Sequence, residues 1–274
     1  MTFQIHYTTV VLKFASQFKK VPANFRYNLI MKKCIVLVLL ASVAIITWPA
    51  HANSQAVNPI EDRYISYIIE DRLFTGGFHI RLSELEDFID EQGEGCKGDL
   101  CLKDYIDEDD GRSVAEMVHD TSHELGINPY VILATLQKEA ALITSSEPEE
   151  WQYRTAMGYG CPDDADCMED FFGFTNQIEL GSKLLRSSYD RACGDKISNI
   201  AWWTHPRVSK GNTIEVDTMP TYLGNCATAS LYNYTPHRVD SAWEPHDGQY
   251  YYGNYNFILL FHDWYPYTDP VEAV

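Results

Sequence analysis

The amino-acid sequence predicts a mainly α protein of the α+β type, with one small β-hairpin and several disulfides. Three observations support this fold class. Several segments carry apolar residues at helical spacing between clear capping signals, one segment has the pattern of a hairpin, and six cysteines follow a leader-like N-terminus. Of the 274 residues, 45% are hydrophobic and 22% are charged, which is ordinary for a globular protein.

The chain is strongly acidic. It has 39 acidic and 21 basic residues, which gives a formal net charge of -18. A negative surface repels phosphate backbones and anionic lipid headgroups. We therefore expect no nucleic-acid partner and no binding to an anionic membrane surface.

The first 52 residues contain basic residues and no acidic ones. Met31-Lys32-Lys33, the apolar run CIVLVLLASVAIITW and Ala50-His51-Ala52 together predict a signal peptide over residues 31–52. A membrane anchor is the alternative, but the run is short for a bilayer span and ends in a cleavage site. Residues 1–30 precede a complete signal, so we interpret them as an extension upstream of the true start. The expected product is secreted or periplasmic, in the cell envelope, with no stable membrane anchor.

Six cysteines remain after this cleavage, and an even number in an exported chain favours disulfides, although six cysteines allow fifteen pairings. Cys96 and Cys101 lie in one short loop, as do Cys161 and Cys167, so local closure pairs them. Cys193 is then left to pair with Cys226. A zinc site is the alternative, but CKGDLC and CPDDADC lack the C-x-x-C spacing of zinc knuckles.

The mature chain divides into an acidic segment, 53–110, expected to pack on the core, and a main domain, 111–270. In the first, LSELEDFIDEQ predicts a helix over 82–92, with Ser83 and Glu86 at the spacing of a capping box. In the second, Ser113 with Glu116 starts a helix that stops at Gly126.

Further elements follow in the main domain. Asn128-Pro129 caps a helix over 129–143, so two helices meet at a tight corner. A later helix over 176–189 carries Gly181 as a point of close packing. The remaining expectations are a hairpin over 201–217 with its turn at Lys210-Gly211-Asn212, a short helix over 225–234 and a closing helical segment over 257–265.

Glu139 is the main candidate for chemistry. On a helical wheel it falls at the edge of the apolar arc of the 129–143 helix, whereas Gln137 and Lys138 point away from that arc. A carboxyl group that faces an apolar surface loses hydration and tends to keep its proton, as a general acid requires. The alternative is a boundary glutamate that reaches into solvent.

Five blocks, CLKDY, GINPYVILATLQKEAALIT, WQYRTAMGYGCPDDADC, FFGFTNQIELGSKLLR and CATASLYNYTPH, resemble an exported bacterial family that acts on peptidoglycan. That family has a lysozyme-like fold of the soluble lytic transglycosylase type. The resemblance covers most of residues 80–267. It implies a lysozyme-like fold for the main domain, which would then be the catalytic domain.

The resemblance also implies roles for single residues. Glu139 matches the catalytic acid of the family. The residues that match the cleft-lining segment and the substrate-contacting Y-N pair are Met157, Gly158, Tyr159, Tyr232 and Asn233.

The chain departs from the family pattern at two places. Ala140 and Ala141 stand where a polar residue would follow the acid. The region around Trp202, Trp203 and Asp217 also follows the pattern loosely, which affects the expected distal sugar subsites.

The expected function is cleavage of the β-1,4 bond between N-acetylmuramic acid and N-acetylglucosamine, as a lytic transglycosylase or a muramidase. Glu139 would donate a proton to the leaving oxygen. No cofactor or metal is expected, and the chain should act as a monomer on peptidoglycan glycan strands. Glu147, Asp163 and Glu179 are the only candidates for a second carboxylate, and none is tied to that role, which favours the lone-glutamate transglycosylase.

Two other classes stay open. A non-catalytic secreted glycan-binding protein or adhesin would need no protonated glutamate. A zinc peptidase would use His119 and His123, which stand at helical i, i+4 spacing without an evident third ligand. Weaker candidates are calcium ligands at Asp163, Asp164 and Asp166, and sugar-stacking rings at Tyr159, Trp202, Trp203, Tyr232 and Tyr234.

Overall fold

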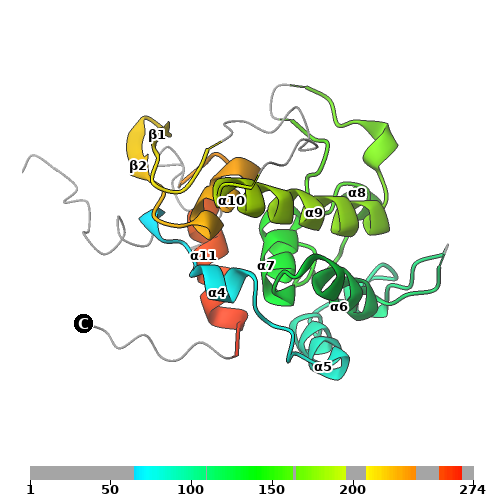
Figure 1. Ribbon diagram of the computed structural model, residues 1–274. Helices are drawn as coiled ribbons and strands as arrows, with labels where there is room; N and C mark the ends of the chain where they lie inside the picture. Colours follow the sequence, from blue (N-terminus) through cyan, green and yellow to red (C-terminus); the bar gives the residue numbers. More distant parts are fainter. Residues whose placement is uncertain (1–64, 109, 163–164, 196–207, 239–252, 267–274) are drawn as a thin grey trace, which may run out of the picture. The chain divides into compact units, whose positions relative to one another are not determined.

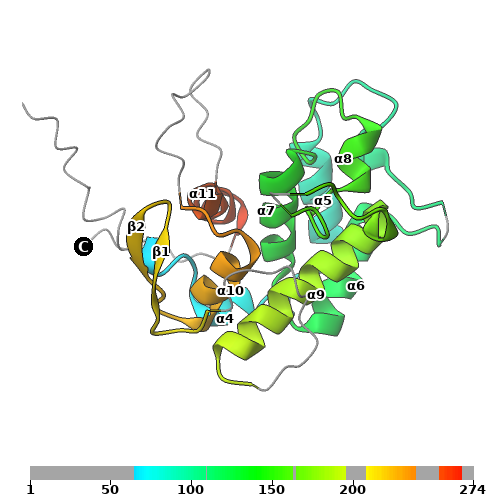
Figure 2. The ribbon, with the colours of Figure 1, turned by 90° about the horizontal axis from the view of Figure 1, so that it is seen from above.

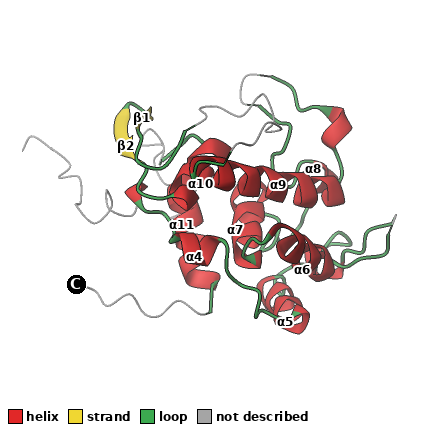
Figure 3. Cartoon of the chain, in the orientation of Figure 1, coloured by secondary structure: helices red, strands yellow, loops and turns green. Residues whose placement is uncertain are grey.

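The computed structural model describes residues 65–108, 110–162, 165–195, 208–238 and 253–266 (Figure 1). Within these ranges the chain forms eight α-helices, two short 3-10 helices and one two-stranded antiparallel sheet, shown by type in Figure 3. The expected mainly helical architecture with one small sheet is confirmed. The expected leader over 1–52 lies outside the described residues. None of the helices in the described ranges is both long and apolar enough to cross a bilayer.

The labels used below follow chain order. The elements are α4 (Asp71–Phe74), α5 (Leu82–Gln92), η2 (Leu102–Asp104), α6 (Val114–Leu125), α7 (Pro129–Ala140), α8 (Glu150–Arg154), η3 (Glu169–Phe171), α9 (Phe174–Ala192), β1 (Thr213–Val216), β2 (Met219–Tyr222), α10 (Cys226–Tyr234) and α11 (Gly253–Trp264).

Helix α7 lies in the middle of the hydrophobic core. All its residues from Pro129 to Leu136 are buried, because α6, α9 and α11 pack against it. Figure 2 shows α7 lying between α11 and α9. Ile68, Phe74 and Leu85 belong to the same core cluster. The described part of the acidic N-terminal segment therefore shares one core with the rest of the chain.

The corner between α6 and α7 forms as the capping signals predict. Ser113 Oγ accepts the backbone N–H of Glu116, whose carboxylate accepts the N–H of Ser113. Gly126 ends α6 with a left-handed φ of 64°. Asn128 Oδ1 then accepts the N–H of Tyr130 at the start of α7.

Helix α5 has the expected bounds, but its expected capping box is wrong. The helix begins at Leu82, so the N-cap is Arg81 and the third helical residue is Glu84. The Glu84 carboxylate accepts the backbone N–H of Arg81 at 2.8 Å. Ser83 lies inside the first turn and cannot act as the cap. A glutamate at the third helical position can accept the backbone N–H of any N-cap residue. The position of the nearest serine therefore does not identify the N-cap of this helix.

Helix α7 ends at Ala140, three residues earlier than predicted, because two side chains replace its helical hydrogen bonds. Gln137 Oε1 accepts the N–H groups of Ile143 and Thr144, and Gln152 Nε2 donates to the carbonyl of Ala140. Ala141 then takes a left-handed φ of 50°. The chain thus turns sharply just after Glu139.

Helix α9 is longer than predicted and packs closely on its neighbours at Gly181. A Cβ atom at this position would lie 2.8 Å from Met157 Cβ and 2.9 Å from Tyr234 Oη. No side chain fits there. The expectation that Gly181 is a point of close packing is confirmed.

The described hairpin lies further along the chain than the predicted one over 201–217, of which residues 201–207 lie outside the described residues. Its strands are β1 and β2, with Val216 opposite Met219, and the turn is formed by Asp217 and Thr218, which have φ of 49° and 66°. The Lys210–Asn212 turn precedes β1 instead. Asp217 and Thr218 lack the Asn-Gly signal of such a turn. Tertiary contacts hold it, because the Asp217 carboxylate accepts the N–H of Arg238 and contacts His237 Nδ1.

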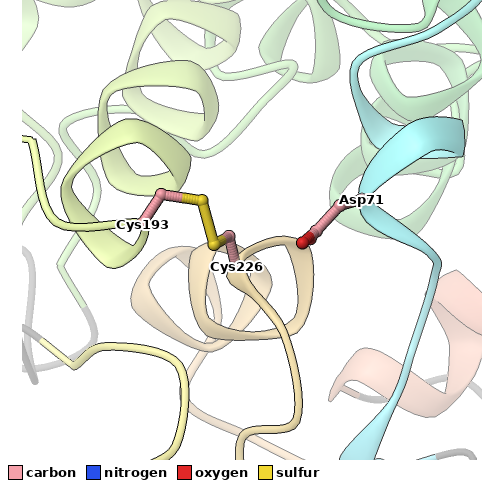
Figure 4. A group of neighbouring side chains, drawn as sticks. All are labelled: Asp71, Cys193 and Cys226. Carbon is pink, nitrogen blue, oxygen red and sulfur yellow. A yellow bond between two sulfur atoms is a disulfide. The ribbon is translucent and has the colours of Figure 1, made fainter.

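The cysteines pair as predicted, at S–S distances of 2.05 Å for Cys96–Cys101, 2.12 Å for Cys161–Cys167 and 2.00 Å for Cys193–Cys226. The third pair joins the end of α9 to the start of α10 (Figure 4). Beside it, Asp71 Oδ1 accepts the N–H of Ala227 at 2.8 Å. The first turn of α10 is therefore fixed by both a disulfide and a carboxylate cap.

Replacing Cys193 and Cys226 together by Ala should lower the free energy of unfolding by about 3–4 kcal/mol in the chain-entropy model, because the closed loop spans 33 residues. The matched loss of Cys96–Cys101, which closes only 5 residues, should cost about 2 kcal/mol. Urea denaturation of both double variants measures the difference. Earlier unfolding of the Cys96 and Cys101 variant would contradict this ranking.

Candidate active site

Glu139 lies in the last turn of α7, where the buried part of the helix gives way to the surface. A quarter of its side-chain surface is exposed. Its Oε1 accepts the Thr235 hydroxyl at 3.0 Å and lies 2.5 Å from Lys138 Nζ. Thr235 directly follows α10, so two segments 96 residues apart in the sequence meet at this carboxylate.

The surroundings of Glu139 differ from the expected apolar surface. Oε1 contacts an ammonium and a hydroxyl, and Lys138 does not point away from the core, because only 5% of its side-chain surface is exposed. Lys138 Nζ also contacts Thr235 Oγ1 and lies 5.7 Å from the centroid of the Tyr234 ring. The end of α10 covers the side of α7 that the helical wheel assigned to solvent. This is why the prediction that Lys138 points away from the core was wrong.

The segment Met157–Tyr159 lies against the second oxygen of Glu139. A Cβ atom on Gly158 would stand 3.5 Å from Oε2, and Gly158 has a left-handed φ of 67°. Met157 is fully buried, and its carbonyl accepts the Tyr234 hydroxyl at 2.6 Å. The structure therefore brings Gly158, the centre of the predicted segment, to Glu139.

Sequence reasoning missed Gln177, which holds this segment. Its Oε1 accepts the N–H groups of Met157 and Tyr159 at 3.1 and 3.0 Å. Its Nε2 donates to the carbonyls of Tyr159 and Phe171 at 2.9 and 2.8 Å. Gln177 is fully buried. A signal was available, since Gln177 falls between Phe174 and Gly181 at helical spacing, on the face of α9 that the apolar residues bury.

Tyr232 and Asn233 do not line a surface next to Glu139, contrary to expectation. Tyr232 is fully buried, and burial raises its pKa above the ordinary value. The Asn233 side chain accepts the N–H of Val208 and donates to its carbonyl, both at 3.1 Å. The neighbouring Tyr234 takes the place near Glu139. Because α10 is buried along most of its length, the identity of the residue that faces α7 could not be read from its apolar pattern.

The phenol of Tyr234 is neutral at physiological pH. Its pKa is raised well above the ordinary value, first by burial and then by the nearby charge of Glu139. It can therefore donate its proton to the Met157 carbonyl at every pH at which such a protein would work. Burial also raises the pKa of Tyr159, whose ring packs edge-on against Phe171.

The candidates for a second carboxylate are not brought to Glu139 by any described contact. Glu179 Oε1 instead accepts Arg112 Nη2 at 2.9 Å, and this bond raises the pKa of the guanidinium. Glu147 is exposed in the loop after α7. Asp163 lies outside the described residues. Contacts among the described residues therefore tie no second carboxylate to Glu139.

Metal sites find little support within the described ranges. His119 and His123 have ring centroids 4.5 Å apart, but among the described residues no third ligand joins them. The one ligand cluster found in those ranges is Asp71 with Cys193 and Cys226 (Figure 4), and its sulfurs are bonded to each other. Asp166 is exposed, whereas Asp164, Trp202 and Trp203 lie outside the described residues.

Comparisons with known proteins return no relatives. No family model matches the chain, and neither a curated protein nor a solved structure matches it. The chemistry of the site is therefore inferred from its residues. A partly exposed carboxyl group with one oxygen held by two donors can transfer a proton through the other oxygen.

Replacing Gln177 by Met should lower the free energy of unfolding by about 3 kcal/mol, because the change removes the partners of a buried backbone group at Met157 and of part-buried ones at Tyr159 and Phe171. Lys183→Ala, on the exposed face of the same helix, should change it by less than about 0.5 kcal/mol. Urea denaturation measures both variants. Equal stability of the two would show that Gln177 does not support the segment.

Proposed function

We propose that the protein cleaves the β-1,4 bond between N-acetylmuramic acid and N-acetylglucosamine in peptidoglycan, with Glu139 as the proton donor. One observation carries the proposal. Glu139 is partly exposed at the end of a buried helix, and its Oε2 faces Gly158, a residue without a side chain. A saccharide oxygen can approach a carboxyl group across a glycine more closely than across a larger residue.

The proposed reaction needs only one carboxyl group. Glu139 gives its proton to the leaving glycosidic oxygen as the bond to C1 of the muramic sugar breaks. The C6 hydroxyl of the same sugar then bonds to C1, and its proton returns to Glu139. The product carries a 1,6-anhydro ring, and no water is consumed. The lone-glutamate route is preferred because one described candidate, Glu179, is ion-paired with Arg112, and no described contact ties Glu147 to the site.

The lysozyme-like fold and an extracellular or periplasmic location are part of this proposal. A buried helix that ends at the acid, a small hairpin and a mainly helical core are compatible with such a fold. The blocks of sequence that resemble peptidoglycan-cleaving proteins supply both Glu139 and Gly158. Three paired disulfides are typical of exported proteins.

A non-catalytic glycan-binding protein is the second candidate, and the Lys138 contact favours it. An ammonium 2.5 Å from Oε1 makes an ion pair, and a carboxylate in an ion pair can bind sugar hydroxyls through its other oxygen. A turbidity assay on purified cell-wall sacculi distinguishes the two candidates. Clearing indicates cleavage, whereas sedimentation of the protein with intact sacculi indicates binding. Clearing that a chelator abolishes would point to the zinc peptidase instead.

Glu139→Gln should reduce the clearing rate of sacculi by at least about a hundredfold, because the amide keeps the shape of the side chain but has no acidic proton to donate. The melting temperature should stay within a few degrees of the parent value. Glu124→Gln makes the same chemical change at an exposed position on α6 and should leave the rate unchanged. A Glu139→Gln variant with near-normal activity would exclude Glu139 as the acid.

The soluble products should carry 1,6-anhydro ends. Attack by the C6 hydroxyl gives a product lighter by one water than the product of hydrolysis, so mass spectrometry of released fragments separates the two routes. Reducing ends alone would show a muramidase reaction. In that case a second group that activates water has to lie near Glu139.

A further inference from the structure

Lys138, Glu139 and Thr235 form a closed set of polar contacts at the end of α7. Lys138 Nζ contacts both Oε1 of Glu139 and Oγ1 of Thr235, and Thr235 Oγ1 donates to the same Oε1. Oε1 therefore has two donors. Among the described residues, Oε2 has no hydrogen-bond partner.

The burial of Lys138 keeps this arrangement in place. Only 5% of its side-chain surface is exposed, so its ammonium has lost most of its water and requires protein partners. The described partners are Oε1 of Glu139, the Thr235 hydroxyl and the face of the Tyr234 ring. A rotation of Glu139 that removed Oε1 would leave a buried charge poorly compensated. The free-energy cost of leaving the buried Lys138 ammonium without Oε1 opposes any rotation of the carboxylate.

Thr235 is itself fixed from two sides. Its N–H donates to the Leu231 carbonyl at 2.8 Å, which ends α10. Its carbonyl accepts the Asn254 side chain at 2.9 Å, and Asn254 is fully buried at the start of α11. The hydroxyl that holds Glu139 therefore stands on a rigid backbone, which a precise site requires.

The opposite oxygen faces a different environment. Gly158 faces Oε2 and is held by two backbone hydrogen bonds. Its N–H donates to the Thr155 carbonyl, and its carbonyl accepts the N–H of Cys161. With Oε1 occupied by donors, Oε2 is the oxygen that remains for a ligand.

We infer that Lys138 and Thr235 are positioning residues that hold Oε1 of Glu139, so that Oε2 is the atom that exchanges a proton with the substrate. This inference rests on the proposed function. In the reaction, Oε2 gives its proton to the leaving oxygen and later takes the proton of the C6 hydroxyl. Lys138 and Thr235 contact only the carboxylate and do not touch the sugar.

The first test is kinetic and uses soluble glycan strands of peptidoglycan with the full-length mature protein. Thr235→Val keeps the shape of the side chain but removes the donor, and it should lower kcat by about tenfold or more with little change in KM. Thr235→Ser restores a hydroxyl and should bring kcat back to near the parent value. Lys138→Met, whose side chain is long and apolar, should lower kcat in the same way. Equal kcat for parent, Val and Met variants would overturn the inference.

The second test does not depend on activity. Crystal structures of the parent, of Thr235→Ser and of the double variant Lys138→Met with Thr235→Val report the direction of the Glu139 carboxylate. We expect the same direction in the first two and a rotated carboxylate in the third. An unrotated carboxylate in the double variant would overturn the inference even if the protein cleaves peptidoglycan. If the carboxylate is rotated in the double variant but the parent protein does not clear sacculi, the positioning role is supported and the proposed function is refuted.

Discussion

The burial of α7 on several sides is the constraint on which the rest of the structure depends. Eight consecutive residues, from Pro129 to Leu136, are removed from water, so neighbouring helices must cover more than one face. Gly181 of α9 allows a second close approach, in which Met157 and Tyr234 pack against that helix. The only part of α7 that reaches the surface is its last turn. The position of Glu139 follows directly from where this coverage ends.

The last turn of a helix is an unfavourable place for a carboxylate. The helix dipole puts partial negative charge there, so an acidic side chain is stabilised only if positive charge or donors come near. Lys138 and the Thr235 hydroxyl supply both. A site that breaks a local rule and is compensated by neighbours is typical of residues kept for function rather than for stability.

Local signals predicted much of this fold, whereas contacts between distant segments decided the rest. The corner between α6 and α7 depends on capping residues adjacent in sequence, and the short disulfides depend on loop closure, so both could be predicted. The hairpin could not, because Asp217 holds its turn through residues 237 and 238. Lys138 could not be assigned either, since a helical wheel does not show which polar side chain a distant segment will cover. The burial of Gln177 could be read from its helical spacing, but its partners at Met157 and Tyr159 could not.

Helix α10 connects the stability of the domain to the geometry of the site. Its first turn is fixed by Cys193–Cys226 and by Asp71, and its last turn supplies Tyr234, which donates to Met157 on one side of Glu139. Thr235, just beyond, donates to Glu139 itself. A helix of nine residues transmits a displacement at one end to the other, because its backbone hydrogen bonds resist bending. A disulfide at the far end of α10 therefore contributes to the position of both groups that face the candidate acid.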